Sequence, residues 1–321
     1  MSAVTYRPAT NDDAALAADL MTAAYPAMAQ DAIVTRYRWD TPRKGFAYAR
    51  FIAEYAGTPI AFLAWVHGPW EQIAEQHCEV EVWLDVAELD RDLLAGMWSW
   101  IGDDAIRHGT QLLLAYCGED EPEMLGALAS VGYSRERLMK AWELDLQAQG
   151  ARLESEAAQA RGLVSPMGIE LTTVAAWQDP DALLKLHELD ELGKQDMPTS
   201  LPIFRGTFED FVRRVSSPDC RPDRTWIALD GDRPVAMSYL RFPPVRGAVS
   251  TGFTCSHPGY RGRGLARAVK LQTLAQAVRL GVPAVRTDND SENAPMLHIN
   301  ERLGYVRRPG FVEHHKRVRK A

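Results

Sequence analysis

Apolar residues recur at helical spacing in one segment near the C-terminal end of the chain. Between Gly264 and about Arg279 they lie three or four positions apart, and Gly281, a residue type expected just past a helix C-terminus, follows them. The apolar positions are Leu265, Val269, Leu271, Leu274, Ala275 and Val278. The pattern predicts an amphipathic helix that begins in a glycine-rich turn.

Extended segments lie on both sides of this helix. Residues 251–257 read as a strand that turns through Pro258 into the helix, and residues 282–287 read as a second strand. A further helix begins near Pro295 and ends at Gly304, since Pro suits a first turn and Gly a C-terminus. The order predicts a strand-helix-strand-helix unit.

The N-terminal half repeats the spacing of this unit. Gly109 and Gly132 are as far apart as Gly281 and Gly304, and the same offset places Tyr133 on Tyr305. Such self-similarity is the signature of an internal repeat. The chain therefore contains two copies of one supersecondary arrangement.

The beginning of each copy shows the same correspondence. Residues 4–8 and 169–173 open the two copies, and hairpin turns follow at Gly57 and Gly231. Between the copies, residues 147–162 are rich in Ala, Glu, Gln and Arg without a strong apolar stripe, which predicts an exposed helical linker. We expect domains at 1–146 and 166–321, with a linker at 147–165.

The amino-acid composition is consistent with two hydrophobic cores, and it excludes some classes of binding partner. A chain of 321 residues exceeds what one core usually supports, and 46% hydrophobic residues suffice for two. The formal charge of −7 argues against a general nucleic-acid binder and favours cationic or neutral substrates such as amines. No segment approaches the length of an apolar membrane span. The sequence predicts no nucleic-acid or membrane partner, and it leaves the oligomeric state open.

The cysteine positions indicate neither a metal site nor a disulfide framework. Cys78, Cys117, Cys220 and Cys255 fit neither a metal-ligand spacing nor a disulfide framework. We expect no metal site, and we expect a reducing cytoplasm as the setting.

The glycine-rich turn has the features of an anion site. Gly262 and Gly264 leave the backbone accessible, and the first-turn amides of a helix carry the positive end of its dipole. Arg261 and Arg263 add charge, and a charge-assisted hydrogen bond contributes about 1.5 to 3 kcal/mol. The segment lacks the P-loop and dinucleotide fingerprints. A plain strand-to-helix turn is the alternative.

Two motifs of this half resemble those of one family. The run from Arg261 to Ala266, Arg-Gly-Arg-Gly-Leu-Ala, matches the Arg/Gln-x-x-Gly-x-Gly/Ala motif of the GNAT (Gcn5-related N-acetyltransferase) superfamily. Residues 293–305 resemble the family's second motif, in which an Asn opens a helix and Leu-Gly-Phe/Tyr closes it. The resemblance covers about residues 167–321. It implies an α/β fold of two tandem GNAT-like domains, each a mostly antiparallel mixed sheet flanked by helices.

The resemblance also implies acetyl-CoA as the cofactor. Its pyrophosphate would lie on the amides of residues 262–266, and its pantetheine arm would pair with the backbone of residues 254–257. The residues expected to bind the cofactor are Thr254, Cys255, Ser256, Arg261, Gly262, Arg263, Gly264, Leu265, Ala266, Arg267, Asn293 and Asn300.

The N-terminal copy departs from this motif. Asp90 and Asp92 stand where the other copy has Gly262 and Gly264, and Glu121 replaces Asn293. A carboxylate about 4 Å from a phosphate costs on the order of 4 kcal/mol at an effective dielectric of 20, which outweighs a helix-end attraction of about 1 kcal/mol. We expect the N-terminal copy to keep the fold and to have lost the cofactor.

Acetyl transfer to an amine needs a proton acceptor. Asp288 precedes Asn293 at a position that carries a catalytic Glu in some relatives, and Glu191 and Asp196 lie in the segment that usually covers the acceptor. Ordinary solvated carboxylates are the alternative for all three. Many relatives place a Tyr as the acid seven residues after the motif Asn, but here that residue is Asn300. The acid is therefore not assigned.

Two functions remain for this sequence. The first is an acetyl-CoA-dependent N-acetyltransferase that acts on a small-molecule amine or a peptide by direct transfer in a ternary complex. The second is a non-catalytic acyl-CoA-binding regulatory or scaffold protein, since Asn300 replaces the usual acid and no base is certain. A fold does not fix its acceptor.

Overall fold

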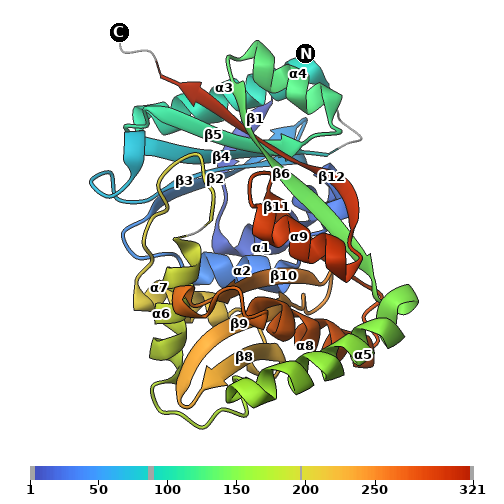
Figure 1. Ribbon diagram of the computed structural model, residues 1–321. Coiled ribbons are helices and arrows are strands. Elements are labelled where there is room, and N and C mark those ends of the chain that lie inside the picture. The colour runs from blue at the N-terminus through green and yellow to red at the C-terminus, as the bar shows by residue number, and fades with distance from the viewer. Residues whose placement is uncertain (1–3, 86–89, 196, 319–321) are drawn as a thin grey trace.

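A single continuous sheet runs through the protein (Figure 1). The computed structural model describes residues 4–85, 90–195 and 197–318. Across the sheet, the strand order is β1-β2-β3-β4-β5-β12-β6-β11-β10-β9-β8-β7. The strands are β1 Thr5–Pro8, β2 Ala47–Tyr55, β3 Thr58–His67, β4 His77–Leu84, β5 Leu112–Gly118, β6 Ser134–Asp145, β7 Ile169–Thr173, β8 Thr225–Asp230, β9 Arg233–Arg241, β10 Ser250–Ser256, β11 Ala284–Asp290 and β12 Val306–Arg317.

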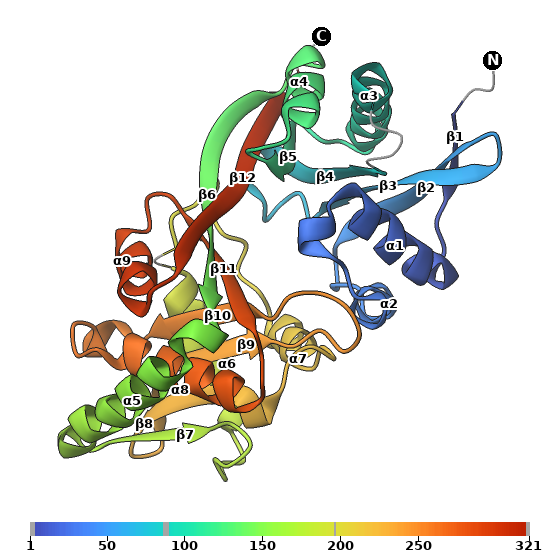
Figure 2. The same cartoon turned by 90° about the vertical axis from the view of Figure 1, so that its right-hand side faces the viewer.

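Helices cover both faces of the sheet in each half. They are α1 Ala14–Ala24, α2 Ala32–Asp40, α3 Arg91–Arg107, α4 Pro122–Ser130, α5 Leu146–Val164, α6 Ala182–Lys194, α7 Phe208–Val215, α8 Leu265–Arg279 and α9 Ala294–Leu303. In the N-terminal half, α3 and α4 pack on one face and α1 and α2 on the other (Figure 2). In the C-terminal half, α5 and α8 cover one face, and α6 and α7 cover the other.

The two halves share one strand pattern. β1 to β4 are antiparallel neighbours and β5 is parallel to β4, just as β7 to β10 are antiparallel and β11 is parallel to β10. The sequence prediction of a mixed α/β fold with tandem GNAT-like architecture is confirmed. The turns at Gly57 and Gly231 have positive φ values of 81° and 60°, as a tight hairpin with glycine allows.

The halves exchange their last strands, which the sequence did not predict. β12, from the end of the chain, lies between β5 and β6 of the N-terminal half. β6 in turn pairs with β11 along all of residues 284–290. Each half therefore depends on the other for the completion of its sheet.

The predicted elements around the glycine-rich turn are present, with shifted ends. α8 spans Leu265–Arg279 and α9 spans Ala294–Leu303, with Asn293 as the N-cap of α9. The strand predicted at 282–287 begins later and extends to Asp290.

The linker helix differs from its prediction. Helix α5 has a buried face, formed by Leu146, Gly150, Leu153, Ala157, Ala160 and Val164, that packs against α8 and the C-terminal core. Small residues make this face weakly apolar in sequence, and they allow the helices to approach closely.

Candidate functional site

The start of α8 leaves its first-turn amides accessible. Gly264 is the N-cap in a left-handed conformation with a φ of 78°, and Gly262 has a φ of 75°. In the described structure no side chain caps this helix start, and a Cβ added at either glycine would meet nothing within 4 Å. Open space, bare amides and the positive end of the helix dipole suit a pyrophosphate, so the residues fit this part of CoA.

A gap between two strands adjoins this turn. β10 and β11 are registered only at Ser250 and Arg286 and then separate. Beyond that point β10 keeps its partner β9, with Cys255 opposite Met237 and Ser256 opposite Ala236. Its other edge is therefore open to an extended ligand that pairs with the backbone.

Two of the predicted side chains on β10, those of Thr254 and Cys255, are occupied within the protein. The hydroxyl of Thr254 lies 2.8 Å from that of Ser238. Cys255 is buried against α6, where a Cβ added to Gly193 would lie 2.6 Å from its own Cβ. Burial raises the pKa of the Cys255 thiol. Along Thr254 and Cys255 the backbone, rather than the side chains, is available to a cofactor.

The arginines near the turn differ in their surroundings. Arg261 and Arg263 are exposed, and Arg263 lies over the Tyr260 ring at 5.0 Å. Arg267 instead pairs with Glu156 of α5 at 2.5 Å. The guanidinium of Arg267 therefore joins two helices.

The two predicted asparagines of α9 have internal partners. Asn293 accepts a bond from the Met296 amide at 3.3 Å and caps the helix. Asn300 is fully buried, accepts a hydrogen bond from the Lys270 amino group at 2.7 Å, and donates one to Asn289 at 2.6 Å. Its role toward a cofactor stays a prediction, because its side chain is used inside the protein.

The corresponding helix start in the N-terminal half has a different cap. Asp90 is the N-cap of α3, and its carboxylate accepts a bond from the Leu93 amide at 2.8 Å. Asp92 adds a second negative charge to the first turn. As N-caps, Asp90 and Gly264 are the structural counterparts, so the sequence alignment that places Asp90 on Gly262 and Asp92 on Gly264 is wrong by two positions. The Asp90 carboxylate occupies the anion position that Gly264 leaves open in α8.

A large cavity separates the halves on the sheet face opposite α3, α8 and α9. Its volume is about 1200 Å3. Its walls include residues 197–204 from the loop after α6, residues of β4 and β5, and the end of β11. The cavity therefore meets both halves of the protein.

Asp288 is the predicted base that reaches this cavity. It lies on β11, beyond the point where β10 and β11 separate, and lines the cavity wall. Its carboxyl is open to the cavity yet surrounded by protein, and this desolvation raises its pKa above the usual range.

The other two predicted carboxylates lie elsewhere. Glu191 of α6 pairs with Lys194 at 2.8 Å and is not part of the cavity wall. Asp196 lies outside the described residues. Of the two candidates that can be placed, Asp288 alone faces the cavity.

Comparisons with known proteins agree with this geometry. The family model described as the acetyltransferase (GNAT) family matches residues 187–305. A tandem GNAT protein from the clavulanic acid biosynthesis pathway superposes with a TM-score of 0.77 at 16% identity, over 99% of this chain and 100% of that one. Residues 187–305 match the GNAT family, and the whole chain shares the fold of tandem GNAT structures.

Other GNAT structures share this fold over nearly the whole chain. A GCN5-related N-acetyltransferase from Sphaerobacter thermophilus gives a TM-score of 0.68 at 19% identity, covering 99% of this chain and 96% of that one. A GNAT-family acetyltransferase from Colwellia psychrerythraea gives 0.60 at 11% identity, over 98% and 100%. No curated protein matches the sequence. Among the described residues, no helix is both long and apolar enough to cross a bilayer.

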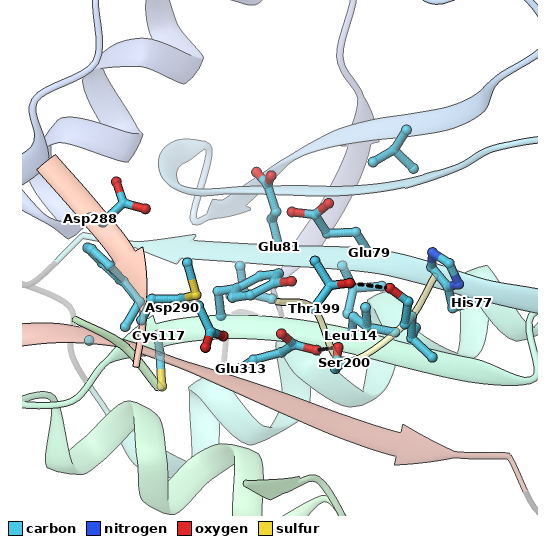
Figure 3. A pocket seen from close by; sticks show the side chains of 18 of the residues that line it. His77, Glu79, Glu81, Leu114, Cys117, Thr199, Ser200, Asp288, Asp290 and Glu313 are labelled. Atoms are coloured by element: carbon cyan, nitrogen blue, oxygen red, sulfur yellow. Dashed lines mark hydrogen bonds between the residues drawn. The ribbon is translucent and has the colours of Figure 1, made fainter. Parts of the chain in front are cut away.

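Several acidic residues of this cavity were not predicted from the sequence. Glu79 and Glu81 project from β4 into the cavity that Asp288 faces from β11 (Figure 3). Burial, together with Glu81 and Glu313, raises the pKa of Glu79 to about 7. Burial also raises the pKa of Glu81, although Trp83 donates a hydrogen bond to it at 2.9 Å.

Glu313 of β12 completes the acidic wall. It is almost fully buried, accepts a hydrogen bond from Ser200, and lies 2.6 Å from the ring of His315. The alternation of Glu79, Val80, Glu81 and Val82 was a usable signal, because it marks a strand with one polar face. The sequence did not show that the other half of the chain covers that face.

Proposed function

We propose that this chain is an acetyl-CoA-dependent N-acetyltransferase. In this proposal the cofactor binds only in the C-terminal half, and the acetyl group passes directly to an amine in a ternary complex. The GNAT fold supports acetyl-CoA-dependent transfer in general. Features of this chain support the binding of the cofactor in the C-terminal half and the transfer to an amine.

The difference between the two helix starts carries the proposal. Gly264 leaves the amides of α8 uncapped, whereas the Asp90 carboxylate already accepts the Leu93 amide of α3. A diphosphate attracted to the first site would meet like charge at the second. One cofactor per chain follows from this difference.

Asp288 supplies the proton acceptor in this scheme. When bound, acetyl-CoA provides an acetyl group activated as a thioester. A protonated amine has to lose a proton before its nitrogen forms the new N–C bond as the C–S bond breaks. The raised pKa of Asp288 makes this carboxylate a better base than an ordinary aspartate. CoA leaves as a thiolate, which needs no protein acid.

The surroundings fit a soluble amine substrate. The cavity that contains Asp288 is large enough for a small molecule and carries several carboxylates. The four cysteines are free and buried. We place the reaction in the cytoplasm, where thiols stay reduced.

Calorimetry with acetyl-CoA tests the cofactor assignment. We expect one site per chain, competition by CoA, and an affinity that falls as salt rises, because phosphate contacts are electrostatic. A stoichiometry of two, or binding that survives the loss of Gly264, would contradict the assignment to the C-terminal half.

Turnover separates the enzyme from a binding protein. Release of the CoA thiol is measured with a panel of amines, with Asp288→Ala alongside. We expect release with at least one amine and a large loss in the variant. Tight acetyl-CoA binding without release for any acceptor would favour the acyl-CoA-binding alternative, which the internal bonding of Asn300 leaves open.

A further inference from the structure

The cavity floor is one face of five neighbouring strands. Across these strands Glu79 pairs with Leu114, Tyr116 with Glu313, and Ala141 with Asp288, and β12 pairs with β6 between them. Residues paired across a sheet point to the same face. Glu79 and Asp288 therefore look into the same space from opposite ends of this floor, as Figure 3 shows.

The distance between these ends is large. The order β4-β5-β12-β6-β11 separates Glu79 from Asp288 by four strand steps. At the usual spacing of adjacent strands, this is on the order of 19 Å. A small monoamine cannot touch both carboxylates.

In the described structure the carboxylates at the two ends form no direct ion pair, although Arg38 and Arg50 lie near enough to Glu81 to oppose the rise in its pKa. Within the described residues, no lysine, arginine or histidine forms an ion pair with Glu79, Glu81 or Asp288. Charged groups held in a partly desolvated space are costly unless a counter-charge joins them. Positive charge would therefore be stabilised at Glu79 at one end of the cavity and at Asp288 at the other.

Apolar groups separate these acidic ends. Leu114, Met139 and Phe311 lie on the same floor, and Leu201 and Phe204 come from the loop opposite it. Such surfaces suit methylene groups rather than water. The alternation of acidic and apolar surface matches a chain of ammonium groups joined by short hydrocarbon segments.

We propose that the acceptor is a long linear polyamine that spans both halves of the protein. One terminal amine lies at Asp288 to receive the acetyl group, and the distal ammonium lies against Glu79 and Glu81. This inference rests on the proposed acetyltransferase function for the reacting end. It gives the N-terminal half, which lacks a cofactor site in that proposal, the task of selecting the acceptor by its second charge.

Binding without the cofactor is the first test. The full chain is titrated by calorimetry with spermine, spermidine, putrescine and n-butylamine. We expect affinity to rise with the number and span of the ammonium groups, with spermine at least about tenfold tighter than putrescine. Equal affinity for spermine and n-butylamine would overturn the proposal.

A charge-removing variant is the second test. Glu79→Gln keeps the shape of the side chain, and we expect it to weaken spermine by about tenfold and to leave putrescine unchanged. Glu170→Gln is the matched control, because Glu170 is an exposed residue of β7 at the far edge of the sheet. An unchanged spermine affinity in folded Glu79→Gln contradicts the proposal. If that variant fails to fold, Glu81→Gln and the wild-type amine series decide the matter.

These results also distinguish the two proposals. If affinity rises with the number of ammonium groups but no amine causes CoA release, the acetyltransferase function is contradicted and the polyamine site is supported. If monoamines and polyamines are acetylated with equal kcat/KM, the acetyltransferase function is supported and the polyamine site is contradicted.

Discussion

The amino group of Lys270 lies 2.7 Å from the side-chain oxygen of Asn300, and both side chains are fully buried. The Tyr305 ring lies 5.0 Å from the same amino group. The side-chain amide of Asn300 also donates a hydrogen bond to Asn289 of β11. A chain of hydrogen bonds therefore joins α8, α9 and the strand that carries Asp288, at the helix position where many relatives have their acid.

Lys270 makes the stability of the protein depend on pH. Burial lowers its pKa to about 7, from an ordinary value near 10.5. Between these two values the unfolded chain binds more protons than the folded one, so this group makes the free energy of unfolding rise with pH. Each pKa unit corresponds to about 1.4 kcal/mol, so the full rise amounts to a few kcal/mol.

The variant Lys270→Met removes this dependence. Urea denaturation from about pH 7 to pH 10 should show wild type gaining stability relative to the variant as the pH rises. Lys44→Met, at an exposed position, should follow the wild-type curve. Parallel curves for wild type and Lys270→Met would show that the lysine is not held neutral by burial.

Asp288→Asn should lower kcat/KM with the best amine by about 10² to 10⁴ and leave acetyl-CoA affinity unchanged. The carboxylate has to be ionised to act as a base, so wild-type activity should fall as the pH drops through its raised pKa. The variant should lack this acidic limb in its pH-rate profile. Asp103→Asn, an exposed change on α3, is the control, and equal kinetics for Asp288→Asn and wild type would make Asp288 an ordinary solvated residue.

Gly264→Asp should abolish acetyl-CoA binding, because it places a carboxylate at the open start of α8, as Asp90 does for α3. A side chain at a φ of 78° also costs about 1 kcal/mol. Gly57→Asp is a matched control with the same strain at the β2–β3 hairpin of the N-terminal half, where a Cβ also meets nothing within 4 Å. Calorimetry should show similar thermal stability for the two variants and a loss of acetyl-CoA binding only in Gly264→Asp.

A chain that ends at Tyr305 should fail to form either half. It lacks β12, which lies between β5 and β6 and pairs with both. Removing it leaves two strand edges unpaired in the middle of the sheet. A chain that ends at Val318 keeps all of β12 and serves as the control.

Limited proteolysis and circular dichroism compare these two chains. We expect rapid digestion throughout the chain that ends at Tyr305, and a stable product from the control. A protected N-terminal fragment in the shorter chain would show that residues 1–146 fold without their partner strand.

Local features of the fold could be predicted from the sequence. The glycines at 262 and 264 and the cap at Asn293 depend on interactions within a few residues, and their signals are visible in one short segment. Helix α8 was predicted within one residue of its start because its apolar positions and its terminal Gly281 agree. The two helix starts likewise differ as the sequence predicts, since Asp90 and Gly264 act on the first turn that follows them.

Long-range features could not be predicted in this way. The place of β12 depends on pairing with β5 and β6, which lie far away in the sequence and offer no local signal. Lys270 looks like a surface residue by type, and only the position of Asn300 on another helix makes its burial possible. Glu79 alternates as a solvent-facing strand residue does, and it becomes part of a cavity because the other half covers that face.

The interleaving of β6 and β12 sets an order of events during protein synthesis. β6 leaves the ribosome long before its neighbours β11 and β12 have been translated. β5 likewise lacks its neighbour β12 until that strand has been translated. Unpaired strand edges in a nascent chain invite aggregation. The synthesis of β12, and not the completion of the first repeat, is therefore the moment at which the sheet can close.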